Sequence, residues 1–292
     1  MEDPPDTHII AVPYDSGHSR LRMGAGPEHL LDNGLGEALR SEGRRTRVTT
    51  ARQEKEPTAE VATAFELHGL VSGQVRRDLD DGEVPLVLSG NCNTAVGTLS
   101  GADPEGLGVV WFDAHGDFNT PETTTTGFID GMGLAIAVGH CWKAMARGVP
   151  GFSAVPEEKV VIAGVWEVHP AEQGRLDASE IAVVGADRME RQGLGALATA
   201  LDALKTKVNR AYVRLDLDVL DARKVGKAND FAAKGGLNGE DLQAALDMVR
   251  ERFEVVAFGI ASYDPTFDAD GGVLHAAVAS ARSLAYVASP TV

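Results

Sequence analysis

Short apolar runs bounded by turn residues alternate along the chain with segments whose apolar positions have helical spacing. The runs are residues 9–12, 46–49, 84–88, 107–112, 160–163, 181–184, 211–217 and 255–260. Several are continuously apolar, which is typical of strands buried on both faces of a parallel sheet. The helical segments include residues 27–39, 58–78, 189–205 and 239–253, the last preceded by a candidate N-cap, Asn238. This order predicts an α/β fold with three layers, α/β/α, and a mainly parallel sheet of roughly eight strands.

The composition is that of a globular protein with an acidic surface. The chain has 292 residues, is 43% hydrophobic and carries a formal net charge of −16, which argues against partners such as nucleic acid or an anionic membrane. No internal repeat or linker interrupts it, so we expect a single domain over residues 1–292. Two cysteines do not make a disulfide framework, and residues 1–6 lack a signal-peptide pattern. A cytoplasmic location is therefore expected.

The first group of candidate functional residues follows the apolar run at residues 107–112. Asp113, His115 and Asp117 occupy every second position, and in an extended backbone alternate side chains point the same way. We therefore expect two carboxylates and an imidazole to converge at the end of a strand. Such ligands suit a divalent ion such as Mn²⁺, Zn²⁺ or Fe²⁺.

A second group has the same character. Asp216 and Asp218 are expected on one face of another strand, with Leu215 and Leu217 pointing into apolar packing. Single aspartates at strand ends usually serve turns. Two apolar strands that each carry stacked carboxylates favour a cation between them, because clustered, partly buried like charges repel. Arg214, two residues before Asp216, is expected to neutralise surplus carboxylates behind the metals.

With these motifs the chain resembles the arginase (ureohydrolase) family over nearly its whole length. That family combines an Asp-Ala-His-x-Asp-x-Asn motif, matched by residues 113–119, with an Asp-x-Asp-x-x-Asp motif, matched by residues 216–221. Residues 120–124 match the family's substrate loop. Residues 13–17 and 23–27 resemble its opening strand, loop and helix.

The resemblance implies two Mn²⁺ ions with a bridging hydroxide as the nucleophile. One ion would be held by Cys92, Asp113, Asp117 and Asp216, and the other by Asp113, His115, Asp216 and Asp218. It also implies assembly into a homo-oligomer, a trimer or hexamer. The implied partner is a small guanidino or amidino compound.

Cys92 is a departure from the family pattern. It stands where the family's Gly-Gly-Asp-His segment carries a first-metal histidine, as in the N-hydroxyarginine hydrolases of the family. A lone cysteine before a helix is usually a small buried hydrophobe, but here ligation is favoured. Thiolate is softer than imidazole, so Zn²⁺ or Fe²⁺ is an alternative to Mn²⁺.

Three further departures concern the substrate. Asp130 stands where arginases carry a proton-shuttling histidine, so it is a candidate proton carrier or substrate anchor. Ser262 replaces a glutamate that grips the guanidinium, and Asp264 or Asp130 could supply that charge instead. His169 replaces a carboxylate that meets the substrate ammonium. These changes argue against L-arginine itself as the substrate.

The resulting hypothesis is a binuclear metal hydrolase of linear C–N bonds in a guanidino, hydroxyguanidino or amidino compound. His115 and Asp130 are its candidate catalytic residues. Substrate contacts are expected from Asn119, which matches the family's substrate-loop asparagine, and Thr126, which takes the place of a serine that often assists it. One alternative keeps the metals but acts on a formimino or amide group. The other is a non-catalytic relative that binds metal or ligand.

Overall fold

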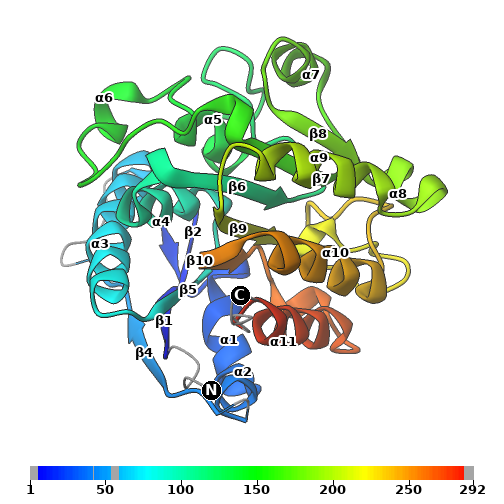
Figure 1. The fold of residues 1–292 in the computed structure, drawn as a ribbon. Coiled ribbons are helices and arrows are strands. Elements are labelled where there is room, and N and C mark those ends of the chain that lie inside the picture. The colour runs from blue at the N-terminus through cyan, green and yellow to red at the C-terminus, as the bar shows by residue number, and fades with distance from the viewer. Residues whose placement is uncertain (1–5, 42, 54–58, 286–292) are drawn as a thin grey trace.

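Eight parallel strands run through the centre of the computed structural model, which describes residues 6–41, 43–53 and 59–285 (Figure 1). Their order across the sheet is β4-β1-β5-β10-β9-β6-β7-β8, and every neighbouring pair is parallel. Their bounds are β1 Thr7–Val12, β4 Thr46–Thr50, β5 Val84–Ser89, β6 Leu107–Phe112, β7 Val160–Val165, β8 Ala182–Gly185, β9 Arg210–Asp216 and β10 Glu254–Ala261. The eight expected strands are therefore confirmed. The N-terminal stretch used to argue against a signal peptide, residues 1–5, lies outside the described residues.

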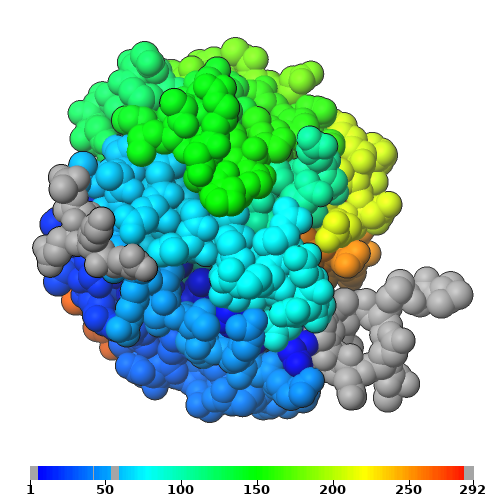
Figure 2. Space-filling model, turned by 90° about the vertical axis from the view of Figure 1, so that its left-hand side faces the viewer, coloured from blue at the N-terminus to red at the C-terminus, as the bar shows by residue number. Residues whose placement is uncertain are grey.

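Helices cover both faces of this sheet and complete the three predicted layers. One face packs against α1 Gly26–Asp32, α2 Leu35–Arg40, α8 Ala186–Gln192, α9 Gly195–Lys205, α10 Gly239–Arg252 and α11 Gly272–Ala285. The other packs against α3 Glu60–Asp80, α4 Ala95–Ala102, α5 Gly133–Ala137, α6 Lys143–Ala146 and α7 Pro170–Asp177. In Figure 2 the cyan residues of α3 lie on the surface of the second face. Among the described residues, no helix is both long and apolar enough to cross a membrane.

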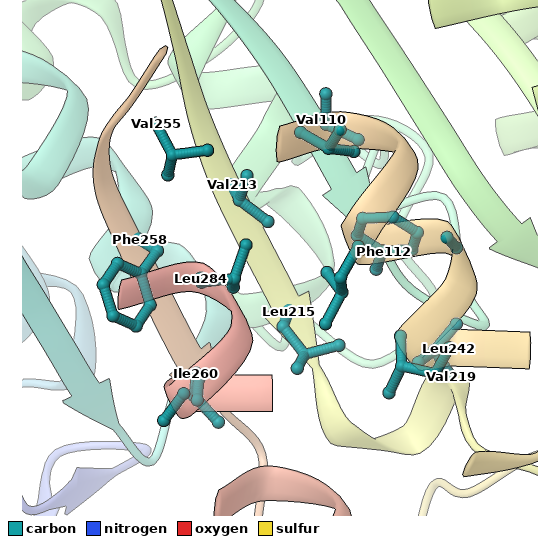
Figure 3. Close-up of a cluster of buried hydrophobic side chains, with 14 of the residues drawn as sticks. Val110, Phe112, Val213, Leu215, Val219, Leu242, Val255, Phe258, Ile260 and Leu284 are labelled. Carbon is teal, nitrogen blue, oxygen red and sulfur yellow. The ribbon is translucent and has the colours of Figure 1, made fainter. Parts of the chain in front are cut away.

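The apolar runs are continuous because the strands are buried on both sides. In β6, Val110 and Phe112 belong to one hydrophobic core, whereas Val109 and Trp111 belong to the other. Figure 3 shows Val110 and Phe112 among the side chains of the first core, with Leu284 of α11. Alternation along the strand thus divides the side chains between two apolar environments.

Two expected helices are each interrupted by a glycine in the left-handed region. The segment expected at 27–39 forms α1 and α2, separated at Gly34, where φ is 95°. The segment expected at 189–205 forms α8 and α9, separated at Gly193, where φ is 69°. Such angles end a right-handed helix. The other two expected helices are α3 and α10, although residue 58 of the first lies outside the described residues. Asn238 caps α10 by accepting a hydrogen bond from the Asp241 amide.

Candidate metal centre

The candidate site lies at the carboxyl ends of the four strands β5, β10, β9 and β6, which are neighbours in the sheet. Asp216 is the last residue of β9, while Asp113 and Ser262 directly follow β6 and β10. Cys92 begins the 3-10 turn Cys92–Thr94 shortly after β5. Parallel strands end at one edge of the sheet, so residues distant in sequence meet there, as is typical of open α/β folds.

The local backbone differs from the extended form predicted for the two motifs. Strand β6 ends at Phe112, and Asp117 has a φ of 48°; β9 ends at Asp216, and Asp218 lies in the 3-10 turn Leu217–Val219. The prediction that strand alternation aligns these side chains was therefore wrong. The physical reason is that aspartate side chains compete for nearby amides. The Asp113 carboxylate accepts from the His115 amide at 2.7 Å, and that of Asp216 from the Asp218 amide at 2.9 Å, which bends both segments.

The side chains nevertheless converge into two overlapping groups of potential metal ligands. Donor atoms of Cys92, Asp113 and Asp117 lie within 4.8 Å of one another, as do those of Asp113, His115 and Asp218. Asp113 belongs to both groups. Asp216 lies beside the first group, because one of its oxygens contacts the Cys92 sulfur. The arrangement has the donors for two cations that share Asp113, a hard oxygen-rich set with one sulfur and one imidazole nitrogen.

Burial makes the surplus of negative charge costly. Asp113, Asp117, Asp216 and Asp218 are each at most 5% exposed. Burial, followed by the charge of Asp113, raises the pKa of Asp117 well above its usual range, and burial with the charge of Asp218 does the same for Asp216. The Asp117 Oδ2 atom is buried and has no hydrogen-bond partner among the described residues. An unpartnered buried carboxylate oxygen aimed into an acidic cluster fits a cation.

The carboxylates of the cluster also raise the pKa values of the His115 imidazole and the Cys92 thiol. Burial alone would lower the pKa of His115, but the carboxylates of Asp218 and Asp113 raise it well above its usual range. The Nδ1 atom of His115 lies 3.4 Å from an oxygen of each. Burial and the charges of Asp130 and Asp216 raise the pKa of the Cys92 thiol. Without a cation, His115 and Cys92 therefore both hold protons that a metal ion would displace.

Arg214 is the buried cation behind the cluster. It is 1% exposed, and its Nη2 atom lies 3.9 Å from Asp216 Oδ2. Its Nη1 atom donates to the Leu215 carbonyl, and its guanidinium lies over the Trp111 ring. Trp111 in turn donates from Nε1 to Asp113 at 3.1 Å. Arg214 does not line the cavity described below and compensates the carboxylates from the buried side.

A cavity of about 140 Å³ opens above these residues. The predicted site residues that line it are Cys92, His115, Asp117, Asn119, Asp130, Asp216, Asp218 and Ser262, while Asp113 lies buried beneath them. Three predicted substrate residues do not line it. Thr126 and His169 are exposed, and Asp264 caps its own turn by accepting from the amide and hydroxyl of Thr266. Their roles stay predictions.

Asp130 is held by two asparagines that sequence reasoning did not single out. The Asn91 side chain donates to one oxygen at 2.8 Å, and the amide and side chain of Asn93 donate to the other at 2.7 and 3.1 Å. Burial outweighs these bonds and raises the pKa of Asp130 to about 7. Both asparagines flank Cys92 in sequence, which was the only available clue.

Glu172 and Asn229 are two further cavity residues without a sequence motif. Glu172, on α7, is 4% exposed and accepts from the Phe118 amide at 2.7 Å. Asn229 donates to the Ser262 carbonyl at 2.7 Å and to Asp218 at 3.4 Å. They come from elements far apart along the chain, so only the fold reveals them.

Comparison with known proteins agrees with this architecture. Residues 5–287 match the model of the Arginase family. An arginase from Bacillus caldovelox is 29% identical, covering 94% of this chain and 96% of its own length. The solved structure of Bacillus caldovelox arginase has a TM-score of 0.86 at 27% identity, covering 96% of this chain and 98% of that one. The structure of Bacillus subtilis arginase has a TM-score of 0.88 at 25% identity, covering 99% and 100%. This chain therefore belongs to the arginase family of hydrolases.

Proposed function

We propose that this protein is a binuclear metal-dependent hydrolase that cleaves a linear C–N bond in a guanidino, hydroxyguanidino or amidino compound. The observation that carries the proposal is the pair of donor groups sharing Asp113 at the floor of a carboxylate-lined cavity. Membership of the arginase family supports the reaction class. With a guanidine the products are urea and a free amine, and water supplies the oxygen of the urea.

The metal ligands would be Cys92, Asp113, Asp117 and Asp216 for one ion, and Asp113, His115, Asp216 and Asp218 for the other. Two bound divalent cations would lower the pKa of a water molecule and so supply hydroxide near neutral pH. Mn²⁺ is the first candidate from the family, and the Cys92 sulfur shifts the preference of its site towards Zn²⁺ or Fe²⁺.

The cavity walls are suited to a cationic substrate. Asp130 and Glu172 place two carboxyl groups beside the metal ligands, where they would attract and orient a guanidinium or amidinium. Asp130, whose pKa is raised to about 7 by burial, would exchange a proton with the leaving amine. His115 lines the same cavity, where it would hold one of the metal ions and is the other candidate catalytic residue.

A formimino or amide substrate is the second candidate, favoured by the state of Ser262. Its hydroxyl donates to Asp216 at 2.6 Å, and its single oxygen lacks the charge and the paired acceptors with which a carboxylate meets the several N–H groups of a guanidinium. Such a substrate has fewer donors to satisfy.

The test measures urea and ammonia released from guanidino, amidino and formimino compounds after the chelated protein is reloaded with Mn²⁺ or Zn²⁺. Urea from a guanidine or turnover of an amidine supports the first candidate, and turnover confined to formimino compounds supports the second. Tight metal binding without any turnover would overturn both and leave a binding protein.

Two variants check the metal assignment. Asp216→Ala should lose metal and activity together, because its carboxylate is a proposed ligand of both ions. Cys92→His should keep activity and bind Mn²⁺ more tightly, since imidazole replaces a soft thiolate. An unchanged metal preference in Cys92→His would argue against ligation by this residue.

A further inference from the structure

Two phenylalanines form an apolar wall beside the candidate metal centre. Phe128 and Phe231 both line the cavity, and their rings stack with centroids 5.4 Å apart and an interplanar angle of 24°. Phe231 is 53% exposed, so much of its ring is accessible from solvent. Met23 lines the same cavity. The stack therefore presents a flat apolar surface that continues into the site.

Hydrogen bonds of the neighbouring residues fix the position of the two rings relative to the rest of the cavity. The Phe231 amide donates to the Asn229 side chain at 2.8 Å, and Asn229 in turn donates to Asp218 and to the Ser262 carbonyl. Phe128 lies two residues before Asp130, which Asn91 and Asn93 fix. Each ring is thus tied through a short segment to a residue at the floor, so its position relative to the metal ligands is set by the fold.

The same cavity offers no basic side chain to a substrate carboxylate. Within the described part of the chain, no lysine or arginine lines it. Asn119 lines it, and its carbonyl oxygen accepts from the Thr123 hydroxyl at 3.1 Å. The proposed metal ions would serve the reacting group, so a carboxylate at the other end of the substrate would meet Asp130 and Glu172 without a basic side chain to compensate it, which costs free energy in a confined site.

We infer that the non-reacting end of the substrate is an apolar or aromatic group without a carboxylate, which packs against the Phe128–Phe231 wall. This inference rests on the proposed hydrolysis of a guanidine or amidine and narrows it to compounds such as arylalkylguanidines. The cationic head would lie towards Asp130 and Glu172, and the flat tail against the exposed face of Phe231. Aromatic contact of this kind contributes beyond simple burial of area.

The experiment compares kcat/KM for phenethylguanidine, methylguanidine and L-arginine in the metal-loaded enzyme. Wild type should prefer phenethylguanidine to both others. Phe231→Ala should lower the phenethylguanidine-to-methylguanidine ratio about threefold to tenfold, mainly through a higher KM for phenethylguanidine. Phe231→Tyr should restore the ratio because it keeps an aromatic face. Phe267→Ala removes another surface phenylalanine, 36% exposed and outside the cavity lining, and should leave the ratio unchanged.

The outcomes separate this inference from the proposed reaction. If methylguanidine is hydrolysed but Phe231→Ala leaves the ratio unchanged, or if L-arginine is the best of the three, the inference is overturned while the reaction stands. If no guanidine releases urea, calorimetric titration with phenethylguanidine decides. Binding weakened by Phe231→Ala and restored by Phe231→Tyr then supports the aromatic wall although no guanidine is hydrolysed, and binding indifferent to Phe231 overturns the inference.

Discussion

Replacing the buried Arg214 by methionine should destabilise the metal-free protein strongly. Methionine keeps an unbranched chain of comparable length in the apolar surroundings of Trp111 but removes the charge. Arg214 is the buried cation closest to the acidic cluster, with Nη2 3.9 Å from Asp216 Oδ2. Its loss leaves the carboxylates of the cluster without compensation from the core side.

The size of the effect follows from this distance. Two unit charges 3.9 Å apart attract by about 4 kcal/mol at an effective dielectric constant of about 20, which is an upper value here because burial raises the pKa of Asp216 and so reduces its charge. Breaking one partner out of a buried pair typically costs about 3–5 kcal/mol, so we expect a loss of about 4 kcal/mol in the free energy of unfolding. In a chain of 292 residues that corresponds to a fall of about 6–7 °C in Tm.

The assay is urea unfolding with EDTA present, repeated with excess Mn²⁺. Added Mn²⁺ should recover part of the deficit, because divalent charge replaces what the guanidinium supplied, and metal affinity should rise in the variant. Arg210→Met is the matched control on the same strand, since Arg210 is exposed and its Nε atom lies 4.0 Å from Glu254 Oε2. The free energy of unfolding of this variant should change by less than about 1 kcal/mol. An Arg214→Met protein as stable as wild type in EDTA would refute the electrostatic reasoning.

Three other predictions concern the site and one helix. Asp117→Asn should stabilise the metal-free protein by about 1 kcal/mol, because burial and the Asp113 charge penalise this carboxylate. The variant should also lose the Mn²⁺-dependent rise in Tm, since it lacks a proposed metal ligand. Equal stability of variant and wild type in EDTA would contradict the first expectation. Burial raises the pKa of Asp130 to about 7, above about 4 in an unfolded chain, so its contribution to stability is present below about pH 4 and lost as pH rises through about 7. Asp130→Asn should therefore show a shallower loss of stability than wild type in urea titrations between those values, and parallel profiles would count against it. Asn238→Ala should cost about 1 kcal/mol in unfolding free energy through loss of the cap bond to the Asp241 amide, and an unchanged urea midpoint would disprove that role.

Helices were harder to predict than strands, and the reason is burial. The helix α4 is buried at all eight of its positions, so it has no polar face and its sequence lacks an amphipathic period. In α1–α2 and α8–α9 the apolar spacing continues across Gly34 and Gly193, and the backbone rather than the pattern ends the helix. Glycine can occupy a helix or break it, so the residue type alone leaves the outcome open.

The site, like the helices, was predicted only in part from the acidic motifs. Their residue types indicated a divalent metal, and the apolar runs that precede them indicated the ends of strands. The argument from strand alternation was wrong, because Asp113 and Asp216 bend the chain by accepting amide hydrogen bonds. Glu172, Asn229 and Phe231 escaped notice, since each lies in a segment without a motif and reaches the cavity only through packing.

The sequence alone determined the α/β class, the eight parallel strands and the presence of clustered metal ligands. Strands buried on both faces appear as continuous apolar runs, and the metal ligands appear as closely spaced aspartate and histidine residues. Tertiary structure alone decided which side chains share the cavity: Asn91 and Asn93 hold Asp130 there, Glu172 and Asn229 join its lining, and Phe128 and Phe231 form the aromatic wall. Those relations depend on distances between segments that lie tens of residues apart in the chain, and on the loss of water around charges brought together.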